Sequence, residues 1–436
     1  MQQDIKNFKM FSTDFLQNYA DFPEHMNSLG KFVYLRTYSR FVHEHGRREV
    51  WKETVKRAAE YNLTMELEHC ARNNIVITKQ RRVRMKQEAI DLFKAMYNLD
   101  QFLAGRTLWA GDIYNEKLKQ IGLSQFNCSH IVIDKIENLY EVFYALMVGT
   151  GVGITCRLEH AKDLAPIRAY GYNIEFKDYE WVGYDGIVED TVLTHDKFDE
   201  VVNIVVGDSK WGWVTSLLKF IEVLTKEEYK NVKTIKFNFD YVRPNGRPLK
   251  GFGGTASGPE PLKEMFEGFV KVIRNEMNPN QKPLEKVNEE YVKLRPIHIL
   301  DMSNLIGYNV VVGGVRRTAE IYLFSPEDYE TVFAKFLLNG IYTEDQLNLL
   351  NEIIEYLEKE GIEYPVVDAQ EAIKQFKENG AYYGTQLHHR RMSNNSVAFI
   401  DKPSKDYVMF LCKMMQLEGE PKQSGLQYSN ILSKCF

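Results

Sequence analysis

The chain has 436 residues, of which 44% are hydrophobic and 26% are charged, a composition typical of a globular protein. Its formal net charge of −5 argues against a basic surface for duplex nucleic acid or for an anionic membrane, so we expect neither as a partner. No stretch approaches the roughly 20 consecutive apolar residues that a membrane-spanning helix needs.

The N-terminus and the cysteines bear on the cellular compartment. The first residues, MQQDIKNFKMFSTDF, lack the apolar core of a signal peptide. The cysteines form no Cys-x-x-Cys pair and no zinc-binding spacing, so we expect no metal site; they are Cys70, Cys128, Cys156, Cys412 and Cys435. An odd number of widely spaced cysteines fits a reducing compartment. We therefore expect a cytoplasmic protein in which a cysteine is reactive rather than part of a structural disulfide.

Residues 1–100 are predicted to form an N-terminal helical region. Apolar residues recur at helical spacing, opposite a charged face, in REVWKETVKRAAEYN (48–62) and RRVRMKQEAIDLFKAMYNL (81–99). From residue 101 the pattern changes to glycine-rich turns between apolar runs. We take this second region, residues 101–421, to be one α/β unit.

The first strong pattern of the second region is a helix. In ENLYEVFYALMVG (137–149) one face carries four apolar residues and Gly149 stops the helix; the four are Leu139, Val142, Phe143 and Leu146. Just before it, SQFNCSH (124–130) places Cys128 ahead of the apolar run IVI. A lone cysteine there is usually a packing residue at a strand end, and the alternative is a reactive thiol.

Further along, predicted strands alternate with predicted helices. TIKFNFD (234–240) alternates apolar and polar residues as a strand does, and PLKEMFEGFVKVI (261–273) follows with helical spacing. NVVVGG (309–314) and SVAFI (396–400) are predicted to be short buried parallel strands. This alternation indicates an α/β sheet or barrel.

A charged segment, residues 325–385, is predicted to be a helical insertion. Within it, TEDQLNLLNEIIEYLEKEGIEY opens with a capping box of Thr343 and Gln346 and ends at Gly361. The apolar residues between these signals lie on one face, at Leu347, Leu350, Ile354 and Leu357. We expect a peripheral excursion with little functional weight.

Two glycine-rich stretches are candidates for binding. GFGGTASGPEPL (251–262) precedes a helix, so its free backbone N–H groups suit a phosphate; the candidates are Gly253, Gly254, Thr255 and Ser257. A tight strand–helix connection would explain the same glycines. VGTGVGIT (148–155) lets a crowded group approach the backbone, but it lacks the full dinucleotide fingerprint, and a close helix–strand crossing explains it equally well.

Two basic stretches also have more than one interpretation. Arg316 and Arg317 in NVVVGGVRRTAEI could grip a phosphate through paired donors, or could form a solvated loop face. LHHRRMSNNSVAF (387–399) holds two adjacent histidines, which point in different directions on any regular element and so argue against a metal site. Asn394 and Asn395, which follow, often close backbone hydrogen bonds at the start of a strand.

The order of these stretches resembles a known family. RTYSRF…GRREVWKETVKRAAE, AGRTLWAG, FNCS, VGTGVG, VGDSKWGW, RPNGRPLKGFGGTASGPEPL, NLIGYNVVVGGVRRTAEI and SNNSVAF follow one another here. Together they resemble the adenosylcobalamin-dependent (class II) ribonucleoside-triphosphate reductases, from residue 30 to residue 421 apart from the helical insertion. The longest two motifs, GFGGTASGPEPL and GGVRRTAEI, are hard to obtain by coincidence.

The resemblance implies a fold and a reaction. The fold would be a ten-stranded α/β barrel of two antiparallel halves, here incomplete, with an N-terminal helical region. The reaction would reduce ribonucleoside triphosphates to 2′-deoxyribonucleoside triphosphates for DNA synthesis. Adenosylcobalamin would supply the radical, and a thiyl radical would remove the 3′-hydrogen so that the 2′-oxygen leaves as water. Two further thiols would donate the electrons and close to a disulfide, which a thioredoxin-type reductant reopens.

The resemblance also assigns roles to residues. By its place in FNCS, Cys128 matches the first thiol of the reducing pair, which would lie buried beside the 2′-carbon. The implied substrate-binding residues are Asn127, Gly149, Gly151, Gly153, Asn394 and Asn395. The implied loop that reports a deoxynucleoside triphosphate effector to the substrate base comprises Gly313, Gly314, Val315, Arg316 and Arg317.

The resemblance fails near the C-terminus. After GEP (419–421) the family has an NPCGE-like finger loop with the radical cysteine, whereas this chain runs KQSGLQYSNILSKCF. Residues 422–436 are therefore an off-pattern tail. Three explanations are open: an interruption of the gene at this point, a second polypeptide that completes the barrel, or a compact variant with Cys435 as its radical site. The alternatives for function are an inactive nucleotide-binding fragment and a relative of the class I large subunit.

Overall fold

The computed structural model describes residues 10–12, 14–42, 45–112, 122–186, 188–247, 255–278, 280–312, 319–363 and 365–419. The chain divides into two compact units, residues 1–127 and 128–436, and each is described by itself. None of the helices in the described ranges combines the length and the hydropathy that a membrane span requires. The borders predicted at residues 100 and 421 stay predictions.

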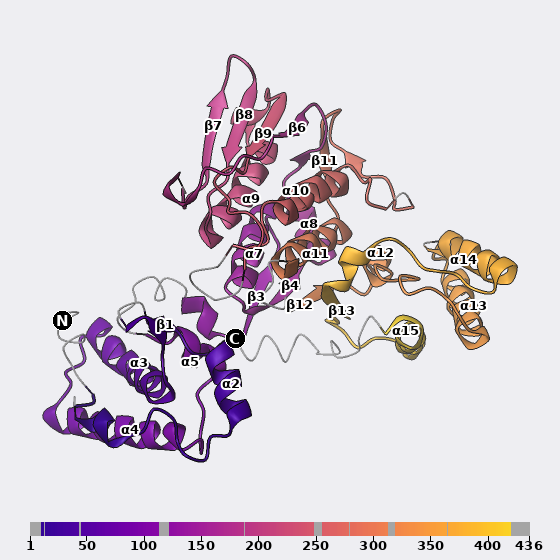
Figure 1. The fold of residues 1–436 in the computed structure, drawn as a ribbon. Helices are drawn as coiled ribbons and strands as arrows, with labels where there is room; N and C mark the ends of the chain where they lie inside the picture. Colours follow the sequence, from indigo (N-terminus) through magenta and orange to yellow (C-terminus); the bar gives the residue numbers. More distant parts are fainter. Residues whose placement is uncertain are drawn as a thin grey trace. The chain divides into compact units, whose positions relative to one another are not determined.

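Unit 1 packs two long helices around an aromatic core (Figure 1). Its elements are η1 (Phe15–Asn18), α2 (Ser28–Thr37), β1 (Phe41–Val42), β2 (Arg47–Arg48), α3 (Trp51–Arg72), α4 (Lys79–Tyr97), α5 (Gly105–Ala110) and η3 (Gly122–Gln125). Both long helices predicted from the sequence are present, as α3 and α4. Their apolar faces meet at Trp51, Val55, Phe93 and Met96, all buried.

Unit 2 is built on a four-stranded parallel sheet with strand order β13-β12-β4-β3. The strands are β3 (Cys128–Val132), β4 (Gly151–Thr155), β12 (Glu320–Phe324) and β13 (Ser393–Val397). Helices α7 (Leu139–Met147) and α11 (Pro296–Val312) pack on one face of this sheet, which we call the helix-covered face (Figure 1). We call the other side the open face.

A second sheet lies on the far side of these helices. Its strands, in the order β6-β9-β8-β7, are β6 (Asn173–Phe176), β9 (Thr234–Asn238), β8 (Val201–Val205) and β7 (Val192–Asp196). Helices α9 (Lys210–Thr225) and α10 (Glu260–Ile273) pack between it and the pair α7–α11 (Figure 1). The rings of Phe237 on β9 and Phe266 on α10 lie 4.3 Å apart, so the predicted strand and helix are both present and share one core.

Smaller elements complete unit 2. A three-stranded sheet, in the order β10-β11-β5, contains β5 (Ile167–Arg168), β10 (Glu285–Lys286) and β11 (Tyr291–Lys293). The short helices are η4 (Ile136–Asn138), α8 (Leu158–Asp163), η5 (Tyr184–Gly186), η6 (Glu227–Tyr229), α12 (Tyr329–Val332) and η7 (His388–Arg391).

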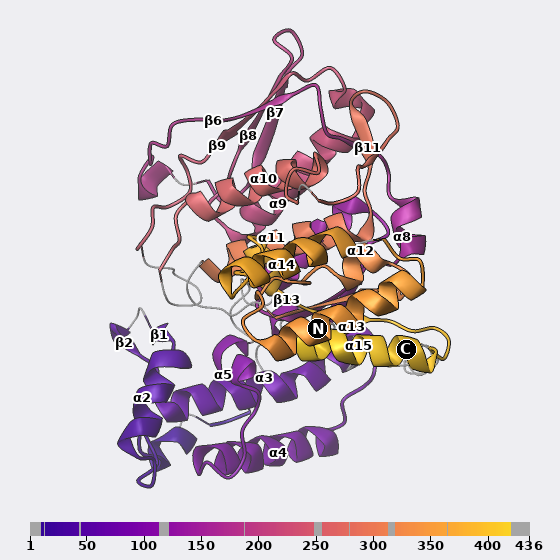
Figure 2. The same ribbon diagram turned by 90° about the vertical axis from the view of Figure 1, so that its right-hand side faces the viewer.

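The charged segment 325–385 is helical, with α13 (Glu344–Lys359) and α14 (Val366–Asn379). The capping box of Thr343 and Gln346 is present, and Gly361 adopts the left-handed conformation at the end of α13 (φ 70°). Helix α15 (Lys405–Glu418) lies beside α13 in Figure 2, and the rings of Tyr356 and Phe410 stack between them at 4.5 Å. The apolar stripe of α13 is therefore buried against a helix that follows it in the sequence.

One predicted strand is wrong. The residues Asn309–Val312 of NVVVGG form the last turn of α11, and the next strand, β12, begins only at Glu320. The β-branched run favours a strand by propensity, but packing of α11 against α7 and α10 outweighs that preference. The strand predicted in SVAFI is present as β13, although it starts earlier, at Ser393.

A buried ion pair connects α11 to η7, the turn that leads into β13. The Nε and Nη2 groups of Arg390 donate to the two carboxylate oxygens of Asp301 at 2.6 and 2.7 Å, and both side chains are almost inaccessible. His389 Nε2 lies 2.8 Å from the same carboxylate. Burial on its own would raise the pKa of Asp301, but the nearby Arg390 and His389 hold it well below its usual range.

We predict that Asp301→Asn destabilises unit 2 by about 3–5 kcal/mol, because it leaves the buried Arg390 cation without a counter-charge. Denaturant unfolding of the full chain measures this loss. The matched control is Glu227→Gln, which breaks the exposed pair with Lys230 and should change stability by at most about 0.5 kcal/mol. Equal stability of the two variants would contradict the structural role of the Asp301 pair.

Candidate functional site

The register of the parallel sheet determines which side chains share its open face. Cys128 pairs with Gly151, and His130 pairs with Gly153, which in turn pairs with Ile321 and through it with Asn394. Side chains alternate between the two faces of a strand, so residues paired in register point the same way. The open face therefore carries Cys128, His130, Thr155, Asn394 and Ser396, beside the two glycines.

Cys128 is a free thiol at the first position of β3. It is exposed, so the expectation of a buried thiol is wrong for the residues that the structure describes. It is not part of the apolar core, which excludes the packing interpretation of a lone cysteine. Asn127, the residue before it, is also exposed. Directly across the ladder stands Gly151, whose carbonyl accepts a hydrogen bond from the Ser129 hydroxyl at 3.3 Å. A thiol beside a residue without a side chain leaves room for another molecule to approach.

The three glycines of VGTGVG have different tasks. Gly149 adopts the left-handed conformation (φ 82°) and ends α7, since its N–H bonds to the carbonyl of Leu146 at 2.9 Å. Gly151 lies beside Cys128. At Gly153 a Cβ atom would lie 2.8 Å from Cδ2 of His130, so only glycine leaves space for that imidazole. Of the three, Gly151 and Gly153 belong to the open face, whereas Gly149 shapes the turn that leads to it.

His130 is a residue of this face that the sequence analysis did not single out. Its Nε2 lies 2.9 Å from the Thr155 hydroxyl on the neighbouring strand. Burial lowers the pKa of His130, so its ring is neutral near pH 7. Alternation from Cys128 would have placed it on the same face, but only the register reveals the contact with Gly153.

The two asparagines of β13 point in opposite directions. Asn394 is exposed on the open face, two strands away from Gly153. Asn395 is buried on the helix-covered face, where its Oδ1 accepts a hydrogen bond from the Ser393 hydroxyl at 2.9 Å. Asn394 therefore shares a face with Cys128, whereas Asn395 bonds to Ser393 on its own strand, whose backbone N–H in turn donates to Asn304 of α11.

The other sequence candidates lie mostly outside the described residues. This applies to the whole proposed effector loop, Gly313, Gly314, Val315, Arg316 and Arg317, to Gly253 and Gly254, and to the tail with Cys435. Thr255 is exposed, and the Ser257 hydroxyl donates to the carbonyl of Gly258 at 3.3 Å. Backbone hydrogen bonds tie Ala256 to Gly246 and Arg247, so this part of the phosphate-loop candidate also serves as a connection into α10.

Glu320, at the start of β12, is a buried acid that the sequence analysis also missed. Neither carboxyl oxygen has a hydrogen-bond partner among the residues that the structure describes. A Cβ atom at Gly307 of α11 would lie only 2.0 Å from its Oε1, so the glycine makes room for it. Burial raises the pKa of Glu320 to about 8, against the opposing charge of Lys335, so the carboxyl is protonated at neutral pH.

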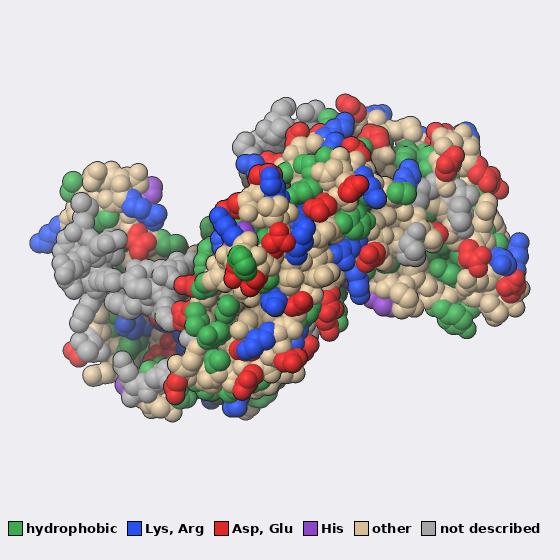
Figure 3. All heavy atoms as spheres, turned by 90° about the horizontal axis from the view of Figure 1, so that it is seen from above, with side chains coloured by type: hydrophobic (Ala, Val, Ile, Leu, Met, Phe, Trp, Pro, Cys, Tyr) green, Lys and Arg blue, Asp and Glu red, His purple; other side chains and the backbone are tan. Residues whose placement is uncertain are grey.

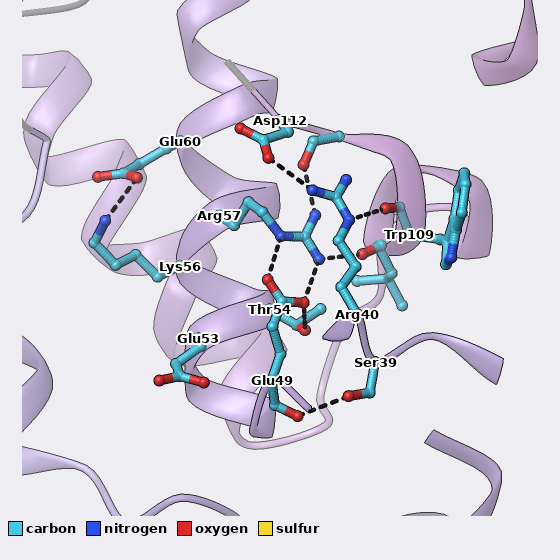
Figure 4. A network of polar contacts seen from close by, with 12 residues as sticks. Ser39, Arg40, Glu49, Glu53, Thr54, Lys56, Arg57, Glu60, Trp109 and Asp112 are labelled. Atoms are coloured by element: carbon cyan, nitrogen blue, oxygen red, sulfur yellow. Dashed lines mark hydrogen bonds and ion pairs between the residues drawn. The ribbon is translucent and has the colours of Figure 1, made fainter. Parts of the chain in front are cut away.

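The motif RTYSRF…GRREVWKETVKR forms a polar network within unit 1 (Figure 4). Arg57 donates to both oxygens of Glu49 at 2.8 Å and also to the carbonyl groups of Leu108 and Gly111. Burial alone would raise the pKa of Glu49, but Arg57 and Thr54 bring it below its ordinary value. The network ties α3 to the end of α5, so Glu49 and Arg57 of this motif stabilise unit 1, whereas Arg47 and Arg48 are exposed.

The surface carries no extended region of one charge on the face seen in Figure 3, where acidic and basic side chains are intermixed. Among the described residues no group of three histidine, cysteine or acidic side chains is arranged to hold a metal ion. The adjacent histidines of η7 bind different partners, since His388 contacts Gln386 and His389 contacts Asp301.

Two parts of the chain match models of known protein families. Residues 11–113 match the ribonucleotide reductase alpha domain, and residues 173–273 match the insertion domain of B12-dependent ribonucleotide reductase. The chain belongs to the family of B12-dependent, class II ribonucleotide reductases. The insertion domain comprises the second sheet with α9 and α10, which the sequence patterns had not separated from the region 101–421.

Individual relatives agree with this assignment. The adenosylcobalamin-dependent ribonucleoside-triphosphate reductase of Lactobacillus helveticus is 30% identical over 346 residues, which cover 71% of this chain and 43% of the relative. The enzyme of the same name from Levilactobacillus brevis is 27% identical over 422 residues, 91% of this chain and 48% of the relative. The chain thus spans about half the length of the curated relatives it matches.

A solved structure supports the fold. The crystal structure of a B12-dependent (class II) ribonucleotide reductase aligns with a TM-score of 0.58 and 24% identity, over 92% of this chain and 48% of that chain. The α/β fold is therefore of the class II reductase type. The described residues contribute the parallel sheet β13-β12-β4-β3 to it.

We predict that Glu320→Gln stabilises unit 2 at pH 8 and leaves its stability at pH 5 nearly unchanged. The folded pKa of about 8 lies above the ordinary value of 4.5, so folding takes up a proton between these values and wild-type stability falls as pH rises through this window. The neutral amide removes this loss, which is on the order of 4 kcal/mol at pH 8. Thermal or denaturant unfolding at both pH values measures it.

The matched control for this prediction is Glu264→Gln, at an exposed position on α10. It should leave the pH dependence of stability as in the wild type. A Glu320→Gln protein with the wild-type pH dependence would show that the carboxyl is ionised in the folded protein at neutral pH.

Proposed function

We propose that this chain is the nucleotide-reducing part of an adenosylcobalamin-dependent ribonucleoside-triphosphate reductase that makes 2′-deoxyribonucleoside triphosphates. The observation that carries the proposal is the exposed Cys128 thiol on the open face, opposite Gly151, in a chain of the class II family. Because the chain spans about half of its relatives, we propose that a second segment or polypeptide completes the barrel.

In this proposal Cys128 is one of two thiols that reduce the ribose. The substrate loses its 2′-hydroxyl as water, the carbon gains hydrogen, and the two thiols lose two electrons and two protons as they form a disulfide. A thioredoxin-type dithiol then reduces the disulfide and is itself oxidised. The second thiol would come from the completing segment, since Cys70 and Cys156 are buried and Cys412 is half-buried on α15.

The cofactor has a limited place in what these residues do. Adenosylcobalamin, on which the named relatives depend, would supply the radical that begins the reaction. The open face offers a reducing thiol, but no described residue can be assigned to holding the corrin, so we derive no step through it. The contribution of this chain is to bind the nucleotide and to supply electrons from Cys128.

Substrate and effector binding extend the proposal. We expect the nucleotide to contact Asn127, which precedes Cys128 in the sequence, and three residues on the same face of the sheet: Gly151, Gly153 and Asn394. Gly149 would shape the turn before Gly151. Two further parts of the proposal are supported by the sequence motifs alone. These are a deoxynucleoside triphosphate effector that acts through residues 313–317 and a phosphate-binding site at residues 253–257. An effector would have to bind the loop differently in its two states to change base preference.

The test is deoxynucleotide formation from a ribonucleoside triphosphate with adenosylcobalamin and a dithiol. We expect turnover when the chain is combined with the polypeptide encoded downstream, and a fall to background with Cys128→Ser because the reducing pair is lost. Cys412→Ser, on α15, is the matched control and should keep activity.

Other results would point elsewhere. No turnover in either mixture would remove the catalytic proposal, and stabilisation by nucleotides without turnover would favour a nucleotide-binding fragment. Turnover without cobalamin would favour a relationship to the class I large subunit.

A further inference from the structure

The open face holds a histidine whose placement the reducing thiol alone does not explain. His130 follows Cys128 by two positions on β3, so the two side chains point to the same side with their Cα atoms about 6.6 Å apart. Both are exposed. Any molecule that reaches the Cys128 sulfur along this face must therefore pass close to the imidazole.

The ring of His130 is held in one orientation by two neighbours on β4. Gly153, its partner in the ladder, leaves the space that the ring occupies, because a Cβ atom there would lie 2.8 Å from Cδ2. The Thr155 hydroxyl then fixes the far edge of the ring, at 2.9 Å from Nε2. Gly153 and Thr155, two positions apart on β4, thus together fix the position of the imidazole ring.

The other edge of the ring is available. With Nε2 engaged by Thr155, Nδ1 has no hydrogen-bond partner among the residues that the structure describes. Because burial lowers the pKa of His130, the ring is neutral at pH 7, with one N–H donor and one lone pair. A neutral imidazole suits a hydroxyl group, whereas a phosphate would be better served by a cation.

A second polar group on this face also lacks a partner. Ser396, in the same row of the ladder as Thr155, is completely buried, and its hydroxyl makes no hydrogen bond to the described residues. Buried polar groups in proteins are nearly always satisfied by protein, water or ligand. Ser396 lies on β13, three strands from Cys128, so it does not contact a ligand at the thiol itself; it shows that the polar character of this face extends beyond His130.

We infer that His130 is a specificity-determining residue, and that its Nδ1 hydrogen-bonds the 2′-hydroxyl of a ribonucleotide bound beside Cys128. The inference rests on the proposed function and specifies the part of the substrate that this face recognises. The sugar is the part within reach, since the reducing thiol must stand beside the 2′-carbon. The 2′-hydroxyl, both a donor and an acceptor, is also what distinguishes a ribonucleotide from its deoxy product.

The experiment follows protection of Cys128 from alkylation by iodoacetamide, read by mass spectrometry on the full chain. Titration with a ribonucleoside triphosphate and with the matching 2′-deoxynucleoside triphosphate gives an apparent affinity for each. In the wild type we expect about tenfold tighter protection by the ribonucleotide, the effect of one hydrogen bond to a neutral group.

Two variants remove the contact in different ways. His130→Phe deletes the polar edge and should reduce the preference for ribonucleotide to less than about twofold, while the deoxynucleotide affinity stays within about threefold of wild type. Gly153→Ala keeps the histidine but displaces its ring, and should reduce the preference in the same way. His195→Gln, on β7 of the second sheet, is the matched control and should keep the wild-type preference.

The outcomes separate this inference from the proposed function. If neither nucleotide protects Cys128 in the wild type, the proposed function fails and the inference with it. If the wild type prefers the ribonucleotide and His130→Phe keeps that preference, only the role of His130 is refuted. His130→Gln, which retains a hydrogen-bonding side chain, should keep part of the preference and serves if His130→Phe does not fold.

Discussion

The parallel, in-register pairing of β3 with β4 is the constraint on which the site depends. It places Cys128 beside Gly151 and His130 over Gly153, where a Cβ atom would lie 2.8 Å from the imidazole. A shift of one residue would turn the thiol and the imidazole to the helix-covered face. Gly153 therefore does more than allow flexibility, since it leaves the space that the His130 ring occupies.

The helix-covered face is held by polar contacts as well as by apolar packing. Along α11, Asp301 meets Arg390, Asn304 accepts from the backbone of Ser393 at 2.8 Å, and Gly307 makes room for Glu320. These three positions recur at helical spacing and face β12, β13 and the turn before β13. Such contacts have a defined geometry, so they select one position of the helix along the sheet. Apolar side chains alone would define that position less specifically.

The class II family assignment and the structure divide the motifs into two kinds. The motif around Arg57 and Glu49 forms a structural network inside unit 1, and the stretch before α10 lies in the insertion domain. Among the described residues, FNCS, VGTGVG, SNNSVAF and the end of GGVRRTAEI, at Ile321, bring side chains or glycines to the open face of the parallel sheet. A motif that identifies a family thus need not contact a substrate, and the register of the sheet distinguishes the two cases.

The sequence alone determined the helices with strong apolar periodicity, the capping box at Thr343, the turn at Gly149 and the family, because these depend on local spacing or on long motifs. It misassigned NVVV, whose β-branched residues end a helix, since packing of α11 overrides a weak local preference. Tertiary structure alone decided that Asn394 and Asn395 face opposite sides and that His130 rests on Gly153. It also decided that Glu320 is buried with no hydrogen-bond partner among the described residues. Each of these depends on contacts between strands and helices far apart in the chain, and local patterns in the sequence do not predict such contacts.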